Sequence, residues 1–259
     1  MARMFVRLAL GLWAFLMVVG CGPSGRRPPE PLRVAAASDL QAALPALAEG
    51  FRQRTGRPVE FVLGSSANLA LQVRQGAPYD VFLSADRARV EALAEEGVIR
   101  PDSVRPYAVG SLALVVHRGS GVEVASLADL ARPEVTRVAI ANPEFAPYGV
   151  AARQALKSAG VWDQLGPKLV LGETVRQALQ FVQTGNAEAG VVGRAIAEVP
   201  EVRVVPVDPA AHAPIVQAMG IVAESPRQDD ARAFAEFLLG PAGQGILARY
   251  GFQPPPAAR

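Results

Sequence analysis

The sequence predicts an α/β protein of two lobes, each a mainly parallel sheet flanked by helices. Three observations support this fold class. Short strand-like apolar runs alternate with helical patterns, the alternation occurs in two successive sets, and 50% of the residues are hydrophobic. Alternating strands and helices produce parallel sheets covered on both faces. A helical segment at the C-terminal end could return to the first set, so we expect the chain to cross between the lobes twice.

The first 31 residues are predicted to direct export and not to fold. Residues 1–20 carry Arg3 and Arg7 ahead of an apolar stretch that is short for a membrane span, as in a signal peptide. The stretch ends at Cys21, the only cysteine of the chain, in a sequence that resembles a bacterial lipobox. We expect lipid on Cys21 to anchor the protein to a membrane surface; the alternative is an ordinary signal with a chance cysteine. Residues 21–31, rich in Pro and Gly, are predicted to be a flexible tether.

In the first set, apolar and β-branched runs predict three strands, and apolar residues at spacings of three and four predict helices. The strands are expected at residues 33–37, 59–63 and 80–84, and helices at 68–75 and 87–96. An earlier helix is predicted from the spacing of Leu40, Leu44, Leu47 and Phe51. Pro45 would remove a hydrogen bond from the interior of that helix, so the regular helix is expected to begin just before it.

The same reasoning applied to the rest of the chain predicts a second lobe and a return to the first. Strands are expected at 111–117, 138–141, 168–171, 191–192, 202–207 and 217–223, helices at 150–159 and 174–183, and two helices across 229–250 with a break near Gly240. We place the first lobe at 32–109 plus 221–254, the second at 110–220, and a tail at 255–259. The crossings are expected near Val109-Gly110 and Met219-Gly220.

Four junctions between a strand and a helix share one chemical character. They are Ala37-Ser38-Asp39, Gly64-Ser65-Ser66-Ala67-Asn68, Ala146-Pro147-Tyr148-Gly149 and Gly172-Glu173-Thr174-Val175. Ligands of open α/β sheets bind beyond the carboxyl ends of the strands. Helix starts there offer unpaired N–H groups and the positive end of the helix dipole to an anion. Ser, Thr, Asp and Asn are also ordinary helix caps, so a single junction carries no such meaning.

Several motifs, in order from residue 33 to residue 252, resemble the molybdate-binding proteins of ABC transporters. The most specific is Gly-Ala-Pro-Tyr-Asp-Val-Phe-Leu-Ser-Ala-Asp at 76–86. The others lie at 34–40, 64–70, 142–149, 175–179, 185–187 and 249–252. The resemblance implies a type II periplasmic binding fold that holds an oxyanion between its lobes, most naturally molybdate or tungstate, and delivers it to a membrane permease.

The resemblance also implies which residues bind the anion. Ser38 would give its hydroxyl and backbone N–H, Asp39 a backbone N–H, and Ser66 both groups at the second junction. Tyr148 would contact the anion from the second lobe, and Val175 would donate its backbone N–H.

At one position this chain departs from the pattern of some members of the family. Those members place a binding tyrosine just after the strand at 190–192, where this chain has Gly193. Other members take the phenol from the Pro-Tyr-Gly junction, as Tyr148 could here. The alternative is a tyrosine that only packs at the start of a helix.

A site made of donors suits a fully ionised oxyanion, which has only acceptors to offer. A buried carboxylate that faced the anion would be left unpaired at a cost. We therefore expect the Asp39 carboxylate to turn away, as a cap or toward solvent. The same logic disfavours protonated phosphate, whereas sulfate remains a competitor that only the size of the cavity would reject. Thiosulfate or another small anion, such as an organic acid, is a further alternative, although a carboxylate usually calls for an arginine clamp.

A secreted hydrolase is the alternative from another functional class. The chain has only two histidines, His117 and His212, and neither a G-x-S-x-G nor an H-E-x-x-H motif. Asp80 and Asp86 could be posed as an acid and base pair, but capping or ion pairing suits residues that flank a strand. We therefore expect no enzymatic activity and no catalytic residues.

Composition narrows the partners further. The formal net charge is +2, and it disappears when Arg3 and Arg7 are removed with the signal. No basic stripe indicates nucleic-acid binding. The expected partners are the small anion, a membrane permease and, through Cys21, a membrane surface. We expect a monomer with no cofactor and no directly bound metal, since molybdenum or tungsten would arrive inside the oxyanion.

Overall fold

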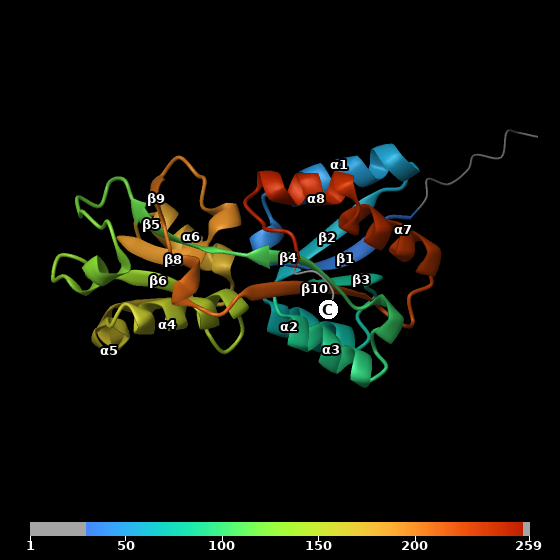
Figure 1. The fold of residues 1–259 in the computed structure, drawn as a ribbon, viewed down its shortest axis with the longest axis horizontal. Helices are drawn as coiled ribbons and strands as arrows, with labels where there is room; N and C mark the ends of the chain where they lie inside the picture. Colours follow the sequence, from blue (N-terminus) through green and yellow to red (C-terminus); the bar gives the residue numbers. More distant parts are fainter. Residues whose placement is uncertain (1–29, 256–259) are drawn as a thin grey trace, which may run out of the picture.

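The computed structural model describes residues 30–255. It has two lobes side by side along the long axis of the molecule (Figure 1). The signal peptide, Cys21 and nearly all of the tether predicted at 21–31 lie outside the described residues, as does most of the predicted tail. None of the helices in the described part is long and apolar enough to cross a membrane.

The first lobe is built on a five-stranded sheet. In spatial order its strands are β2 (Val59–Gly64), β1 (Leu32–Ala37), β3 (Val81–Ser84), β10 (Ile215–Ile221) and β4 (Arg105–Gly110). The strand β1 runs parallel to β2 and β3, while β10 runs antiparallel to β3 and β4. Four of its five strands thus run in one direction and β10 alone runs against them, so the sheet is mainly parallel, as predicted.

Helices cover both faces of the first sheet. Three of them, α1 (Leu44–Thr55), α7 (Gln228–Leu239) and α8 (Pro241–Arg249), lie on one face, and α2 (Ser66–Arg74) and α3 (Arg87–Glu95) lie on the other (Figure 1). Because side chains alternate along a strand, Val34 and Ala36 join the core on the first face and Ala35 joins the core on the second. Pro45 stands in the first turn of α1, where its missing N–H costs nothing, so the predicted start of that helix is confirmed.

The second lobe repeats this topology. Its sheet has the order β7 (Leu169–Gly172), β6 (Val138–Ala141), β8 (Ala189–Gly193), β5 (Leu112–His117) and β9 (Val202–Pro206). The strand β6 is parallel to β7 and β8, and β5 is antiparallel to β8 and β9. One face carries α4 (Pro147–Ser158) and the short α5 (Trp162–Leu165), and the other carries α6 (Val175–Gln183) (Figure 1).

Short 3-10 helices complete the connections of both lobes. They are η1 (Ser38–Leu40), η2 (Pro101–Ser103), η3 (Leu127–Ala131), η4 (Gly166–Lys168), η5 (Arg194–Ile196) and η6 (Pro209–Ala211). Two of these elements, η1 and η5, pack against each other across the lobe boundary, and η1 also packs against α6. The segments that follow β1 and β8 therefore bring the two lobes together.

The chain crosses between the lobes at two places. The first crossing joins β4 to β5 at Ser111, next to the predicted Val109-Gly110. The second joins β9 to β10, so it lies between residues 206 and 215. The prediction near Met219-Gly220 was wrong, because both residues lie inside β10 and pair with β3 of the first sheet. The first lobe accordingly takes back the chain from Ile215 rather than from residue 221.

Candidate functional site

The five residues predicted to bind an anion lie together. Residues from β1, β2 and η1 of the first lobe and from the starts of α4 and α6 of the second enclose one small hollow. Its lining is Ala37, Ser38, Asp39, Gly64, Ser65, Ser66, Ala85, Ala146, Pro147, Tyr148 and Val175. The hollow lies at the carboxyl ends of β1, β2, β6 and β7, where an open α/β sheet binds its ligands.

Two helix starts supply the donors of the first lobe. Ser38 begins η1 directly after β1, and Ser66 begins α2 behind the cap residue Ser65, whose side chain accepts from the amide of Asn68 at 3.3 Å. The amide of Ala85 donates to Ser66 Oγ at 3.1 Å, which uses one acceptor site of that hydroxyl and leaves its hydrogen to donate. Both serines are buried. Hydroxyl and amide hydrogens thus line this side of the hollow.

Two further helix starts supply donors from the second lobe. Proline at position 147 opens α4 without an N–H of its own, and the amides of Gly149 and Val150 both donate to Ala146 O. The amide of Tyr148 is therefore the first N–H of α4 and has no acceptor within the helix. Val175 holds the corresponding place in α6, behind the cap Thr174. All of these groups are donors, as a site for a fully ionised oxyanion requires.

The Asp39 carboxylate does not take the position expected from the sequence. Its residue is only 1% exposed and caps no helix, so the predicted orientation as a cap or toward solvent was wrong. Instead, Oδ2 accepts from the hydroxyl of Tyr148 at 3.0 Å and from Nε2 of Gln217. Burial raises the pKa of Asp39 to about 6, and the hydrogen bonds from Gln217 and Tyr148 offset part of that rise.

The phenol of Tyr148 is committed to this carboxylate. Its single hydrogen goes to Asp39, while its oxygen accepts from Gln217 Nε2 at 3.1 Å. Among the groups of Tyr148, the amide N–H is thus the one that remains for a ligand. The ring also accounts for Gly193, because a Cβ there would lie 3.0 Å from Tyr148 Cε1. The ring of Tyr148 thus occupies the space into which a side chain at position 193 would point.

Sequence reasoning missed Gln217 and Tyr107. Gln217 is fully buried in the middle of β10, and its Oε1 accepts from the Tyr107 hydroxyl at 2.5 Å. A glutamine inside an otherwise apolar strand could have drawn attention, since buried polar groups need partners. The strand β4, which carries Tyr107, reads Arg-Pro-Tyr-Ala-Val-Gly and gives little strand signal.

The lobes also meet directly around the hollow. The amide of Ala67 at the start of α2 donates to Phe145 O of the second lobe at 3.3 Å, and Asn68 Nδ2 donates to Glu173 Oε1. Together with the bond between Tyr148 and Asp39, these contacts join both sides of the site. The structure therefore represents a closed arrangement of the two lobes.

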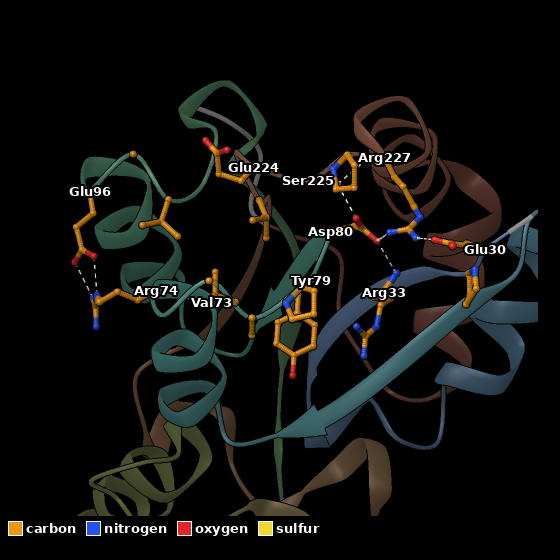
Figure 2. Close-up of a pocket in the computed structure, with 18 residues that line it drawn as sticks. Glu30, Arg33, Val73, Arg74, Tyr79, Asp80, Glu96, Glu224, Ser225 and Arg227 are labelled. Atoms are coloured by element: carbon orange, nitrogen blue, oxygen red, sulfur yellow. Dashed lines mark hydrogen bonds and ion pairs between the residues drawn. The ribbon is translucent and has the colours of Figure 1, made fainter.

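The other carboxylates considered from the sequence have structural roles. Asp86 caps α3 by accepting from the amide of Ala88 at 3.0 Å. Asp80 lies at the other end of the first sheet, just before β3 and beside a larger pocket. Its carboxylate accepts hydrogen bonds from the Arg33 amide and the Ser225 hydroxyl, and it faces the guanidinium of Arg227 at 3.5 Å (Figure 2). The prediction of capping and ion pairing is confirmed for both residues.

Comparisons with known proteins agree with this architecture. Residues 32–253 match the family model described as bacterial extracellular solute-binding protein. The molybdate-binding protein ModA of Rhodobacter capsulatus is 36% identical over 208 residues, which cover 78% of this chain and 80% of the relative. A putative ABC transporter substrate-binding lipoprotein of Bacillus subtilis, YvgL, is 32% identical over 93% of this chain and 95% of its own length. These relatives are solute-binding proteins rather than enzymes.

A solved structure extends the similarity to three dimensions. The periplasmic molybdate-binding protein of Azotobacter vinelandii superposes with a TM-score of 0.80 at 31% identity, covering 86% of this chain and 99% of the other. The sulfate-binding protein SubI of Mycobacterium tuberculosis shares the fold at 20% identity, with a TM-score of 0.75. The two-lobe α/β fold predicted from the sequence is thus confirmed, and the chain belongs to the family of bacterial extracellular solute-binding proteins that includes the molybdate-binding protein ModA.

Proposed function

We propose that this protein captures molybdate or tungstate between its lobes and delivers the anion to the permease of an ABC importer. One observation carries the proposal: Ser38, Ser66, Tyr148 and Val175 come from four separate helix starts on two lobes and line a single small hollow. Unpaired amides and hydroxyls at such starts are suited to an ion that can only accept hydrogen bonds. The similar proteins of Rhodobacter capsulatus and Azotobacter vinelandii are molybdate-binding proteins, so molybdate is the ligand to test first.

The chemistry of the hollow supports a fully ionised tetrahedral anion in particular. The one carboxylate that lines it, that of Asp39, has its Oδ2 engaged by Tyr148 and Gln217. An organic carboxylate commonly requires an arginine clamp. No arginine is among the residues that line the hollow. The Asp39 amide, at the second position of η1, is proposed as a further donor to the anion.

Isothermal titration with molybdate, tungstate, sulfate and phosphate tests the proposal. We expect tight binding of molybdate and tungstate, with sulfate and phosphate weaker. Strong sulfate binding with no molybdate binding would assign the protein to another anion. No heat with any of the four would remove the oxyanion function itself.

We also propose that the protein is exported and held at a membrane surface by lipid on Cys21, and that it meets the permease as a monomer. Replacing Cys21 by Ser removes the thiol that would carry the lipid. In fractionated cells we expect the Cys21→Ser variant to leave the membrane fraction, while the wild type stays in it. The same variant should bind molybdate unchanged, which serves as the control for folding. Membrane retention of the variant would contradict the anchor.

A further inference from the structure

A buried hydrogen-bonded network joins the two lobes directly behind the hollow. Three of its members belong to the first lobe: Asp39 in η1, Tyr107 in β4 and Gln217 in β10. The fourth, Tyr148, is the only one from the second lobe. All four side chains are buried, at 2% exposure or less. The network therefore lies across the surface along which the lobes must part when a ligand enters or leaves.

The direction of each hydrogen bond is fixed by the chemistry of the groups. The Tyr107 hydroxyl donates to Gln217 Oε1, so Gln217 turns its Nε2 toward Asp39 and Tyr148. Tyr148 accepts one of these bonds and spends its own hydrogen on Asp39 Oδ2. Its phenol is consequently satisfied within the protein. No hydrogen remains on it for a bound anion.

The ring of Tyr148 fits a slot left by two glycines. A Cβ on Gly110 would lie 2.1 Å from the Tyr148 hydroxyl, and one on Gly193 would lie 3.0 Å from the ring. Gly110 ends β4 at the first crossing, and Gly193 ends β8 in the second lobe. The absence of side chains at both places lets the phenol reach across to the first lobe.

On the basis of the proposed function, we infer that Tyr148 is an inter-lobe positioning residue, which holds the closed form through Asp39 and Gln217, and that closure around the anion is coupled to uptake of a proton by Asp39. The amide of Tyr148 faces the ligand, while its phenol stabilises the arrangement of lobes that brings this amide to the site. The two ends of one residue thus serve binding in different ways.

The charge around Asp39 explains the proton. Its carboxylate accepts hydrogen bonds from Gln217 and Tyr148, which are both neutral, and Gln217 in turn accepts from Tyr107. None of the ion pairs among the described residues includes Asp39. The arginines on the other elements that pack against η1 do not pair with it: Arg194 of η5 pairs with Glu198, and Arg176 of α6 lines an outer groove. A dianion beside an ionised, buried Asp39 would place like charges together without a cation between them.

Protonation of Asp39 relieves this repulsion. The raised pKa of its carboxyl, about 6 in the closed form and caused mainly by burial, agrees with the geometry, and a bound dianion raises it further. In an open form that exposes Asp39 to water, the carboxyl returns toward its ordinary, lower pKa. The closed, loaded form then binds more protons than the open form, so affinity rises as the pH falls toward 6.

Titration of molybdate into the wild-type protein, in buffers of different ionisation enthalpy between pH 6 and pH 8, measures the proton directly. We expect uptake of a fraction of one proton per ion at pH 6.5 to 7, falling toward zero at pH 8. The Asp39→Asn variant keeps the size of the side chain but cannot titrate, so its binding should take up no proton. Molybdate binding by the wild type without proton uptake, or with the same uptake in Asp39→Asn, would overturn the coupling.

The Tyr148→Phe variant removes only the hydroxyl. We expect its affinity for molybdate to fall about tenfold to a hundredfold at pH 8, as for a lost hydrogen bond to a charged group. This deficit should shrink at pH 6, where Asp39 is protonated and the charge-assisted bond is already lost. A phenol that bound the anion itself would give a deficit that does not change with pH, and that result would overturn the positioning role.

A matched control is available in the same lobe as Asp39. Tyr79 also donates its hydroxyl to a side chain, Gln72 Oε1 at 2.7 Å, but within the first lobe and far from the hollow. Tyr79→Phe should bind molybdate as the wild type does at both pH values, and an equal loss in this variant would overturn the special role of Tyr148. Absence of molybdate binding in the wild type would instead refute the proposed function, so the two failures are distinguishable.

Discussion

The first lobe buries one aspartate at each end of its sheet, and the two have opposite surroundings. Asp80, at the amino end of β3, accepts from the Arg33 amide and the Ser225 hydroxyl and faces the guanidinium of Arg227 at 3.5 Å. Asp39, beyond the carboxyl end of β1, has only neutral partners, Tyr148 and Gln217. A carboxylate with a cation and several donors is satisfied and structural. A carboxylate without a cation, such as that of Asp39 beside the hollow, changes its protonation when a charged ligand enters.

This difference separates stability from binding within one sheet. The pocket beside Asp80 is larger than the hollow beside Asp39, yet its charged side chains are largely paired with each other, as with Arg74 and Glu96 or Arg227 and Glu30 (Figure 2). The small hollow has donors, such as the Tyr148 amide, that have no acceptor among the residues 30–255 that the structure describes. The state of the polar groups, and not the size of the cavity, distinguishes the proposed binding site from the pocket beside Asp80.

The largest effect is expected on stability, from a substitution of Asp80 at the amino end of β3. Asp80→Ala leaves the Ser225 hydroxyl and the Arg33 amide without their acceptor and Arg227 without its buried partner. We expect the free energy of unfolding to fall by about 3 kcal/mol, measured by urea denaturation. Under conditions in which Asp80→Ala stays folded, it should bind molybdate as the wild type does. A loss of affinity with unchanged stability would reverse the roles of the two ends.

A smaller effect, on molybdate binding, is expected from a substitution of Ser66, which follows the carboxyl end of β2. Ser66→Ala removes a buried hydroxyl that accepts from the Ala85 amide and is proposed to donate to the anion. We expect the free energy of molybdate binding to weaken by about 1–3 kcal/mol, measured by titration calorimetry. Unchanged affinity would remove Ser66 from the site.

The smallest change in stability is expected at a helix cap that follows the carboxyl end of β3. Asp86 caps α3 but does not line the hollow, so it provides a matched test for a polar residue that follows a strand. Asp86→Ala should lower the free energy of unfolding by about 1 kcal/mol, the usual cost of a lost cap, and leave molybdate affinity unchanged. Thermal denaturation and titration of the same sample measure both quantities. Weaker binding in this variant would show that the site extends beyond the hollow.

The sequence predicted the parts of the fold that depend on local patterns. The strands of the first set, the two helices around Gly240 and the start of α1 at Pro45 follow from spacing, capping and the geometry of proline. The strand β4 was missed because it contains Pro106 and Gly110 and is recognisable only by its partner β10. The second crossing was misplaced for the same reason, since pairing of β10 with β3 and β4 is a long-range property.

The candidate site divides in the same way. The four helix starts could be found because anion-binding junctions follow strands in a recognisable order, and the resemblance to molybdate-binding proteins singled them out. The orientation of the Asp39 carboxylate could not be predicted. It depends on Gln217 and on the phenol of Tyr148, 178 and 109 residues away along the chain. No local pattern connects these residues, and only the folded lobes bring them together.

A crystal structure of the protein with tungstate tests the central claim most directly, because the heavy atom can be located without ambiguity. We predict one ion in the hollow, with the hydroxyls of Ser38 and Ser66 and the amides of Tyr148 and Val175 at about 2.7–3.2 Å from its oxygens. The phenol of Tyr148 should remain on Asp39. An ion bound elsewhere, or held by residues of one lobe alone, would contradict the account.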